Sequence, residues 1–263
     1  DLNKQRVHSM SFDPTSRLDG KVAVIAGGLG AIGYASARRL AALGATCVLL
    51  HRGTSADAAE RAAALPTPNG QRHAVLVADI VDTPSLQRAA AHVAEAQGRC
   101  DILVNSAGHT RPVPAADLEG LTDALIDELL QANFRGVFAT IRAFTPLLKA
   151  SGDGLIVNVS SIAGFTGVGS NLAYVAAKAG LDVVGDALAK ALAPAVRVVS
   201  VSPGAVESAF VPGRGEDFKA KMASTTPLGR IGQPEDVAAT VEALATTLRF
   251  VTGTRIVVDG GRH

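Results

Sequence analysis

Tyr174 and Lys178 stand four positions apart in the segment LAYVAAKAG. On a helix this spacing brings both side chains to one face, one turn apart. An unperturbed tyrosine has a pKa of ~10, which is too high for a base at neutral pH. A neighbouring ammonium favours the phenolate and lowers that pKa. The pair is therefore suited to move a proton between an alcohol and a carbonyl, whereas its alternative interpretation is the polar face of an amphipathic helix.

Ser161 precedes this pair in the segment VNVSSIAG. It directly follows the apolar run 155–160, so we expect it at the end of a strand. A hydroxyl in that position can donate a hydrogen bond to the oxygen of the carbonyl that is reduced. Together the three side chains predict the interconversion of an alcohol and a carbonyl.

This chemistry needs a hydride carrier, and the stretch AGGLGAIG at 26–33 is the candidate cradle. It fits two registers. Gly28, Gly30 and Gly33 spell G-x-G-x-x-G, whereas Gly27, Ala31 and Gly33 fit a looser pattern with alanine in the middle position. An apolar run precedes the stretch and a helical pattern follows it, so backbone N–H groups at the helix start can bind a pyrophosphate.

The end of the next predicted strand bears on the choice of cofactor. An acidic residue there would bind the 2′-hydroxyl of an adenosine ribose, but the sequence has His51 and Arg52. Arg52 can pair with a 2′-phosphate through charge-assisted hydrogen bonds, and its alternative is a solvated surface arginine. We expect NADP(H) to be favoured over NAD(H).

Short apolar runs alternate with Ala- and Leu-rich helical stretches along the chain. Near-continuous hydrophobicity suits strands that are buried on both faces, and the alternation favours a doubly wound parallel sheet with right-handed crossovers. We predict an α/β, single-domain Rossmann fold of about seven strands with helices on both faces. The predicted strands are 22–26, 47–50, 74–78, 101–105, 155–160, 196–202 and 255–258.

The predicted domain spans 18–263 and follows a polar tail at 1–17. A long helix is expected from Asn171 to Leu192. The segment 204–232 is rich in Gly, Pro and polar residues and is long for a connection. Such segments are usually functional lids or disordered, so we assign it as the substrate loop region.

Composition argues against several other classes of protein. The 263 residues carry a formal net charge of +1 without a basic block, which argues against nucleic-acid or membrane partners. The two cysteines, Cys47 and Cys100, have no redox spacing, and the six histidines have no ligand spacing, so no metal site is expected. The N-terminal residues lack the apolar stretch of a signal peptide, which favours a cytoplasmic location.

From about Leu18 to the end, the chain resembles the short-chain dehydrogenase/reductase family. The resemblance rests on elements that occur in the family's order: AGGLGAIG, ADI at 78–80, NSAG at 105–108, LLQANFRG at 129–136, Ser161, Y-x-x-x-K at 174–178, PGAVES at 203–208 and TGTRIVVDGG at 252–261. The resemblance favours the looser glycine register. It also implies a homo-oligomer, a tetramer that uses the long Tyr-bearing helix and the C-terminal VDGG region.

The resemblance implies a role for each matching residue. Tyr174 would be the acid/base, Lys178 would lower its pKa and hold the nicotinamide ribose, Ser161 would orient the substrate oxygen, and Asn133 would support a water-mediated proton relay. Asp79 would accept from the adenine amine while Ile80 packs on the ring. The residues expected to bind the cofactor are Gly27, Leu29, Gly30, Ala31, Ile32, Gly33, Arg52, Asp79, Ile80, Asn105, Ala107, Gly108, Tyr174, Lys178, Pro203, Gly204, Val206 and Ser208.

The residues expected around the substrate are mainly apolar, and they fit a hydrophobic or 3-oxoacyl-type ketone. They are Ser161, Phe165, Leu172, Ala173, Tyr174, Ala205, Phe210 and the segment 209–228, which is a candidate lid. Two alternatives stay open: an NAD-dependent dehydrogenase of a sugar, polyol or hydroxysteroid, and a non-catalytic dinucleotide-binding scaffold or regulator. A nucleotide-binding kinase or transferase is disfavoured because the sequence has no G-x4-G-K-[ST] segment.

Overall fold

The computed structural model describes residues 17–53, 56–213 and 215–263. These residues contain a seven-stranded sheet in the order β3-β2-β1-β4-β5-β6-β7, in which all paired strands run parallel. The strands are β1 (Val22–Ala26), β2 (Thr46–His51), β3 (Ala74–Val77), β4 (Ile102–Asn105), β5 (Gly154–Val159), β6 (Val196–Pro203) and β7 (Thr254–Val258). The predicted α/β Rossmann architecture is confirmed, and the predicted strand ends differ by at most a residue.

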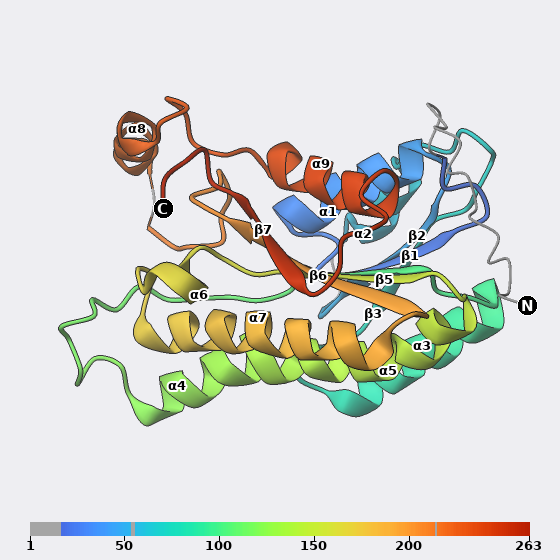
Figure 1. The fold of residues 1–263 in the computed structure, drawn as a ribbon, viewed down its shortest axis with the longest axis horizontal. Coiled ribbons are helices and arrows are strands. Elements are labelled where there is room, and N and C mark those ends of the chain that lie inside the picture. The colour runs from blue at the N-terminus through green and yellow to red at the C-terminus, as the bar shows by residue number, and fades with distance from the viewer. Residues whose placement is uncertain (1–16, 54–55, 214) are drawn as a thin grey trace, which may run out of the picture.

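Helices cover both faces of the sheet, as Figure 1 shows. Those on one face are α1 (Ala31–Ala42), α2 (Ala58–Ala63) and α9 (Pro234–Ala245), and those on the other are α3 (Thr83–Gln97), α4 (Asp123–Leu130), α5 (Gly136–Ala150) and α7 (Leu172–Leu192). A π-helical turn, η1 (Gln131–Arg135), joins α4 to α5, and two further helices, α6 (Ala163–Thr166) and α8 (Glu216–Thr225), lie at the edge where α7 begins.

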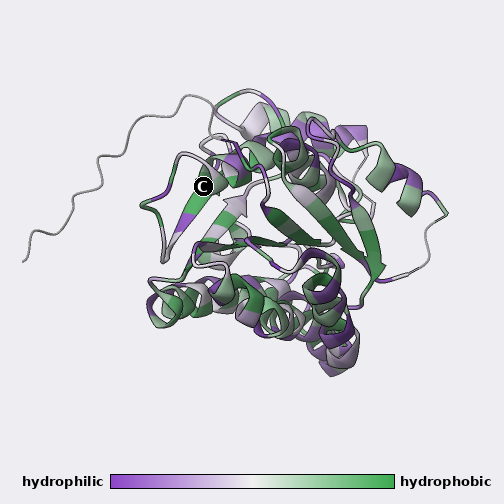
Figure 2. Cartoon of the chain, turned by 90° about the vertical axis from the view of Figure 1, so that its right-hand side faces the viewer, coloured by the Kyte–Doolittle hydropathy of each residue, from purple (hydrophilic) through white to green (hydrophobic). Residues whose placement is uncertain are grey.

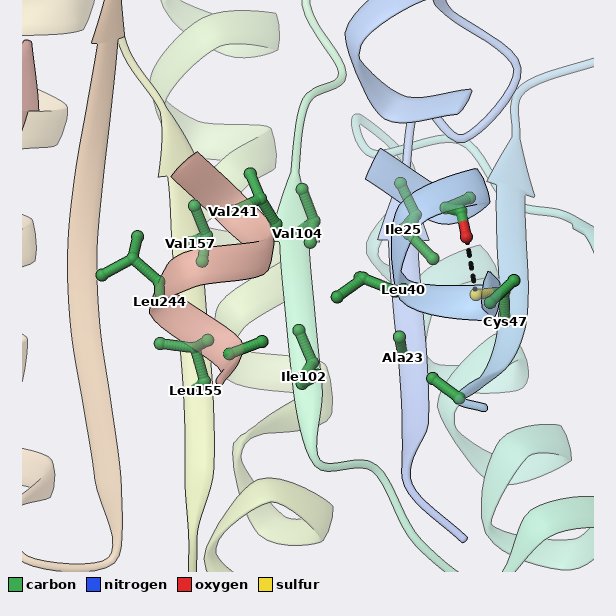
Figure 3. Packing of buried hydrophobic residues seen from close by; sticks show 14 of the residues in the cluster. Ala23, Ile25, Leu40, Cys47, Ile102, Val104, Leu155, Val157, Val241 and Leu244 are labelled. Carbon is green, nitrogen blue, oxygen red and sulfur yellow. Dashed lines mark hydrogen bonds between the residues drawn. The ribbon is translucent and has the colours of Figure 1, made fainter. Parts of the chain in front are cut away.

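The core consists of two apolar layers, because alternate residues of each buried strand point to opposite faces. In β1, Ala23 and Ile25 face the layer under α1 and α9, whereas Val22 and Val24 face the layer under α3, α5 and α7. Figure 3 shows the first layer, where Leu40 and Leu244 pack against the sheet. Figure 2 shows the hydropathy of the whole chain, with hydrophobic residues concentrated on the strands between the two layers of helices. Each fully buried Val, Leu or Ile contributes about 1.5–3 kcal/mol.

Both cysteines lie in this core. Cys47 of β2 donates from Sγ to the carbonyl oxygen of Ala37 at 3.4 Å, the contact dashed in Figure 3. Burial raises the pKa of the Cys47 thiol to about 12, and burial raises the pKa of Cys100 as well. The two thiols are therefore packing residues, as their apolar sequence context predicts.

The segment 204–232 is more ordered than its composition indicates. It contains the helix α8, and Val206 forms an isolated parallel bridge with Gly232 at its far end. Both ends of the segment are thereby fixed beside β6. Sequence reasoning missed α8 because its apolar residues are few and one side of it is solvent-exposed.

The predicted tail 1–17 lies almost entirely outside the described residues, which begin at Arg17. Arg17 itself pairs with Asp19 at 2.8 Å, at the start of the domain. Within the described ranges, none of the helices combines the length and the hydrophobicity that crossing a bilayer requires.

Candidate active site

A cavity of about 1190 Å³ opens along the carboxyl edge of the sheet. Consecutive strands each contribute residues where they end: Gly27 after β1, His51 at the end of β2, Ser106 after β4, Ser160 after β5 and Pro203 at the end of β6. Ligands of doubly wound sheets bind at this edge. The order of the strands therefore brings together motifs that lie far apart in the sequence.

The glycine-rich turn between β1 and α1 has three positions where a side chain would clash, Gly27, Gly28 and Gly33. Gly27 has φ +75°, and a Cβ on it would meet the backbone N of Ala107 at 2.7 Å. A Cβ on Gly33 would lie 2.3 Å from the carbonyl oxygen of Gly27. At Gly30 the nearest atom would be 3.2 Å away, and Ala31 is exposed. A Cβ on Gly28 would lie 2.8 Å from the Cβ of Leu49 and 2.9 Å from the carbonyl oxygen of Ile25. The tight contacts therefore include Gly27 and Gly33, which the looser register requires, whereas Gly30, the middle glycine of the G-x-G-x-x-G register, is the least crowded of the four glycines, and the methyl of Ala31 has room.

The N-terminus of α1 faces the same cavity. Gly30 is its N-cap residue and supplies no side-chain cap, so backbone N–H groups of the first turn are free for an anion. No acidic side chain lies in that turn. The turn therefore presents partial positive charge where a pyrophosphate would need it.

Helix α7 is held at its start by Asn171. The Oδ1 atom of Asn171 accepts from the backbone N of Tyr174 at 2.7 Å, which satisfies a free donor of the first turn. Its Nδ2 atom donates to the carbonyl oxygen of Arg111 at 2.8 Å and to Oγ1 of Thr110 at 3.2 Å. This one side chain therefore fixes the first turn of α7, which carries Tyr174, to the loop after β4.

The side chains of Ser161, Tyr174 and Lys178 line the cavity together. Lys178 is 4% exposed, and its Nζ donates to the carbonyl oxygen of Val159 at 2.8 Å and lies 5.6 Å from the centre of the Tyr174 ring. Burial lowers the pKa of Lys178 to about 8, while the negative charge of Asp182 opposes that shift. The Oγ of Ser161 accepts from the backbone N of Ala163 at 3.1 Å, which leaves its hydroxyl hydrogen available.

Asn133 lies in the π-helical turn η1 and is fully buried. Its Nδ2 donates to the carbonyl oxygens of His109 at 2.8 Å and Leu129 at 3.0 Å. Its Oδ1 atom has no hydrogen-bond partner in the described part of the chain. A buried amide oxygen of this kind normally binds an ordered water, so this position suits the water that the expected relay requires.

The remaining residues expected to contact the cofactor also line the cavity, with one exception. At the end of β2 they include Arg52, and after β3 they include Asp79 and Ile80. The exception is Asn105, which is buried beneath the cavity and donates from Nδ2 to Oδ1 of Asn158 at 2.9 Å.

On the substrate side, the ring of Phe210 lies 6.0 Å from the ring of Tyr174, and Ala205 lies nearby in the lining. The described lining residues do not include Phe165, Leu172 or Ala173. Phe165 instead contacts the guanidinium of Arg255 at 5.0 Å and the ring of His263 at 5.3 Å.

Comparisons with known proteins agree with this geometry. A family model described as Enoyl-(Acyl carrier protein) reductase matches residues 27–263. A putative ketoacyl reductase 2 of the granaticin polyketide synthase from Streptomyces violaceoruber is 38% identical over 95% of this chain and 98% of its own length. The chain belongs to the short-chain dehydrogenase/reductase family. The 3-oxoacyl-(acyl-carrier-protein) reductase of Aquifex aeolicus is 36% identical over 93% of this chain and 98% of its own.

Solved structures of short-chain dehydrogenase/reductases share the fold. A dehydrogenase/reductase from Sinorhizobium meliloti superposes with a TM-score of 0.85 at 34% identity, covering 95% of this chain and 98% of its own. Membership of the family implies an NAD(P) dinucleotide as cofactor and a small molecule as substrate. The glycine turn, the uncapped start of α1 and the unpartnered Oδ1 of Asn133 fit such a cofactor.

Sequence reasoning missed several residues that line this cavity. Phe218, Lys219 and Met222 come from α8, and Arg262 and His263 come from the segment after β7. Lys219 pairs with Glu207 at 2.6 Å, and His263 with Asp259 at 2.8 Å. No local pattern marks these residues, because only the tertiary fold brings α8 and the last residues over the carboxyl edge.

Proposed function

We propose that this protein is an NADP(H)-dependent reductase of small carbonyl compounds, with a 3-oxoacyl-type or other hydrophobic ketone as substrate. One observation carries the proposal. Ser161, Tyr174 and Lys178 line the same cavity as the glycine turn and the apolar Phe210. The proton donor, the hydrogen-bond donor and the cofactor-binding turn thus line the same cavity. The reaction requires this, because hydride and proton must reach the same carbonyl group.

The glycine turn and the start of α1 would hold the dinucleotide, whose nicotinamide would supply the hydride for the carbonyl carbon. Tyr174 donates its phenolic proton to the developing alkoxide oxygen, and Ser161 donates a hydrogen bond to the same oxygen. The Lys178 ammonium stabilises the phenolate that Tyr174 becomes and would also hold the nicotinamide ribose. Asn133 would hold a water of the relay that returns a proton from solvent, through Lys178, to the phenolate of Tyr174.

The substrate class follows from the lining on the far side of Tyr174. Phe210, which lies beside Tyr174, and Phe218, Met222 and Ala205 supply apolar surface to the cavity, which the charged Glu207, Lys219 and Arg262 also line. An apolar wall binds an alkyl or acyl chain by removing it from water. The two curated relatives named above are a putative ketoacyl reductase and a 3-oxoacyl reductase, which supports a 3-oxo compound in this position.

The decisive experiment is an assay of cofactor absorbance with a panel of carbonyl compounds and alcohols, each with NADPH or NADH and the matching oxidised forms. The proposal expects 3-oxoacyl thioesters and hydrophobic ketones to be reduced with NADPH. Preferential oxidation of polyols or hydroxysteroids with NAD⁺ would favour the dehydrogenase alternative. Cofactor binding without turnover across the panel would favour a non-catalytic scaffold.

Tyr174→Phe tests the assignment of the acid/base. The variant keeps the aromatic ring and its contact with Phe210 but has no phenolic proton, so we expect kcat to fall by at least about 100-fold. The dissociation constant of NADPH, measured by fluorescence, should change little. A variant that retains a tenth or more of the wild-type kcat would contradict the role of Tyr174.

Arg52→Ala tests the preference for NADP(H). Arg52 is exposed at the rim of the cavity after β2, where it can pair with a 2′-phosphate. We expect kcat/KM for NADPH to fall about 10-fold or more, consistent with the loss of a charge-assisted contact, while kcat/KM for NADH changes little. An unchanged ratio of the two values would exclude Arg52 as the residue that selects the cofactor.

A further inference from the structure

A row of polar side chains crosses the sheet beneath the catalytic helix α7. In the strand register, Asn105 of β4 pairs with Asn158 of β5, Asn158 with Ser200 of β6, and Ser200 with Arg255 of β7. Residues at matching positions of parallel strands point to the same face. Leu103, Ile156 and Val198 stand two positions before Asn105, Asn158 and Ser200, so they point to the same face of the sheet. They belong to the layer under α5 and α7, and the polar row therefore faces α7.

Asp182 of α7 lies over this row. It is 3% exposed, and its Oδ2 lies 3.5 Å from Nη1 of Arg255. Its Oδ1 atom has no hydrogen-bond partner among the described residues, and the same holds for Nδ2 of Asn158 and Oγ of Ser200. A carboxylate is rarely buried without a function or a matching charge, because its desolvation is costly.

Besides Arg255, a second positive charge near Asp182 is that of the catalytic lysine. Lys178 and Asp182 are four positions apart on α7, so they occupy one face of the helix, one turn apart. Both are buried, and the negative charge of Asp182 raises the pKa of Lys178, against the effect of burial. The ammonium is otherwise held by a single carbonyl, that of Val159.

The other elements packed against α7 supply few competing charges. Strand β7 supplies Arg255, whose side chain is 41% exposed. Strands β5 and β6 supply the neutral Asn158 and Ser200, and the four residues of α6 carry no charge. The charged residues of α4 and η1, namely Asp123, Asp127, Glu128 and Arg135, are exposed, as is Lys190 at the far end of α7, while Asp186 is half-buried one turn beyond Asp182.

We propose that Asp182 is a positioning residue for catalysis: its buried carboxylate keeps the Lys178 ammonium charged and in place, and Arg255 limits the strength of that effect from the solvent side. This rests on the proposed role of Lys178. Asp182 is not among the residues that line the cavity. It acts through Lys178, and its unpartnered Oδ1 atom lies with the unpartnered polar atoms of Asn158 and Ser200, which suit an ordered water.

Asp182 and its partner Arg255 carry opposite charges, so their removal must have opposite effects on Lys178. Without the negative charge of Asp182, the Tyr174–Lys178 pair loses its first proton at a lower pH. Without the positive charge of Arg255, it loses that proton at a higher pH. The sign holds whichever member of the pair loses the proton, because a nearby charge shifts both in the same direction.

The test uses Asp182→Asn and Arg255→Gln, which keep size and polarity, and Asp186→Asn as the control on the same helix. Far-UV circular dichroism and thermal unfolding establish that each variant is folded. For each, kcat/KM for carbonyl reduction is measured against pH, and the dissociation constant of NADPH is measured against pH by cofactor fluorescence. The chain has no tryptophan, so the cofactor emission does not overlap with protein emission.

We expect the alkaline limb of kcat/KM to move down by about one pH unit in Asp182→Asn. In Arg255→Gln it should move up by a smaller amount, because a half-exposed charge is screened, and in Asp186→Asn it should stay within 0.2 pH unit, an estimate from that same screening. The loss of NADPH affinity at high pH should move in the same directions. If Asp182→Asn lowers kcat/KM at all pH values but leaves the alkaline limb at the wild-type pH, Asp182 has a merely structural role and the proposal is overturned.

The remaining outcomes of these measurements also support or overturn the proposed role of Asp182. Shifts of Asp182→Asn and Arg255→Gln in the same direction, or an NADPH affinity that does not depend on pH in the wild type, would overturn the proposal. If Asp182→Asn does not fold, the upward shift in Arg255→Gln tests it alone. The binding measurement needs no substrate, so an inactive substrate panel, which would refute the proposed function, leaves this test intact.

Discussion

Lys178 combines two properties that oppose each other: its side chain is 4% exposed, and its proposed role requires a positive charge. Burial lowers its pKa to about 8, so most of the ammonium persists at neutral pH and is lost as the pH rises through that value. A compact charge on a buried stem is therefore sensitive to each neighbouring charge. At the residue scale, the charge of the Lys178 ammonium therefore depends on the few groups that surround it.

Gly33→Ala tests the steric argument for the glycine turn. The added Cβ would lie 2.3 Å from the carbonyl oxygen of Gly27, so the backbone must shift, at a cost of about 1–3 kcal/mol. We expect the dissociation constant of NADPH to rise about 10-fold or more and thermal stability to fall. Titration by cofactor fluorescence and thermal unfolding measure both effects.

The matched control is Gly30→Ala, whose Cβ would meet its nearest atom at 3.2 Å. Its backbone has φ −73°, which alanine adopts without strain. We expect a change of less than threefold in cofactor affinity, given that only a small displacement is needed. A loss of NADPH affinity in Gly30→Ala as large as that expected for Gly33→Ala would favour the literal G-x-G-x-x-G register. A small change in both variants would contradict the steric argument for Gly33.

At the scale of elements, helix α7 connects the outer surface of its layer, the core and the cavity. Asn171 fixes its start, Tyr174 and Lys178 line the cavity from its first two turns, and Asp182 lies over the sheet one turn later. The helix is also the longest described, with 21 residues. Displacing its start therefore moves the acid/base itself.

Asn171→Ala tests this coupling. It removes the cap of α7 and the two hydrogen bonds to the loop after β4, which costs about 1–2 kcal/mol. For a chain of this length, that lowers Tm by roughly 2–8 °C. We expect kcat to fall several-fold while the dissociation constant of NADPH stays nearly unchanged, because the glycine turn lies on another element.

A control at another helix start separates stability from alignment. Thr122 caps α4 by accepting from the backbone N of Leu125 at 3.4 Å, on a helix other than the one that carries Tyr174. Thr122→Ala should lower Tm to a comparable degree without a selective loss of kcat. A loss of kcat that merely follows the loss of stability in both variants would refute the alignment argument.

How far the sequence predicts these elements depends on the range of the interactions. Tyr174 and Lys178 could be found because their relation is local to one helix, and the strands because burial on both faces leaves continuous apolar runs. The pairing of Asp182 with Arg255 could not be found, since it depends on α7 packing against β7. Helix α8 and the placement of Arg262 in the cavity likewise follow from tertiary contacts, not from a pattern.

At the scale of the whole molecule, an apolar strip follows the outer surface of the α4–α5–α7 layer. On α7, Ala176, Gly180 and Val183 follow helical spacing, and Val183 is 69% exposed. Beside them, Phe134 packs over Gly180 at 3.4 Å from its Cβ position, and Phe138 is 38% exposed. We propose that a second copy of the chain covers this strip in the expected tetramer.

Val183→Asp tests that arrangement. A carboxylate placed in the middle of an apolar interface would lose its water without gaining a partner. We expect size-exclusion chromatography with light scattering to show a smaller assembly than the wild type. Leu118→Asp, at an equally exposed leucine outside the strip, 70% exposed, should leave the mass unchanged; a wild-type mass in both variants contradicts the proposed interface.

The two buried cysteines have a practical consequence. Because burial raises the pKa of both thiols, neither is ionised at neutral pH, and maleimide reagents attack the thiolate. The two native cysteines should therefore not react with such reagents in the folded protein, and they need not be replaced before a site-specific label is introduced. A single cysteine introduced at the exposed Ala220 of α8 could carry a spin label or a dye, and it would report directly whether α8 moves when NADPH is added.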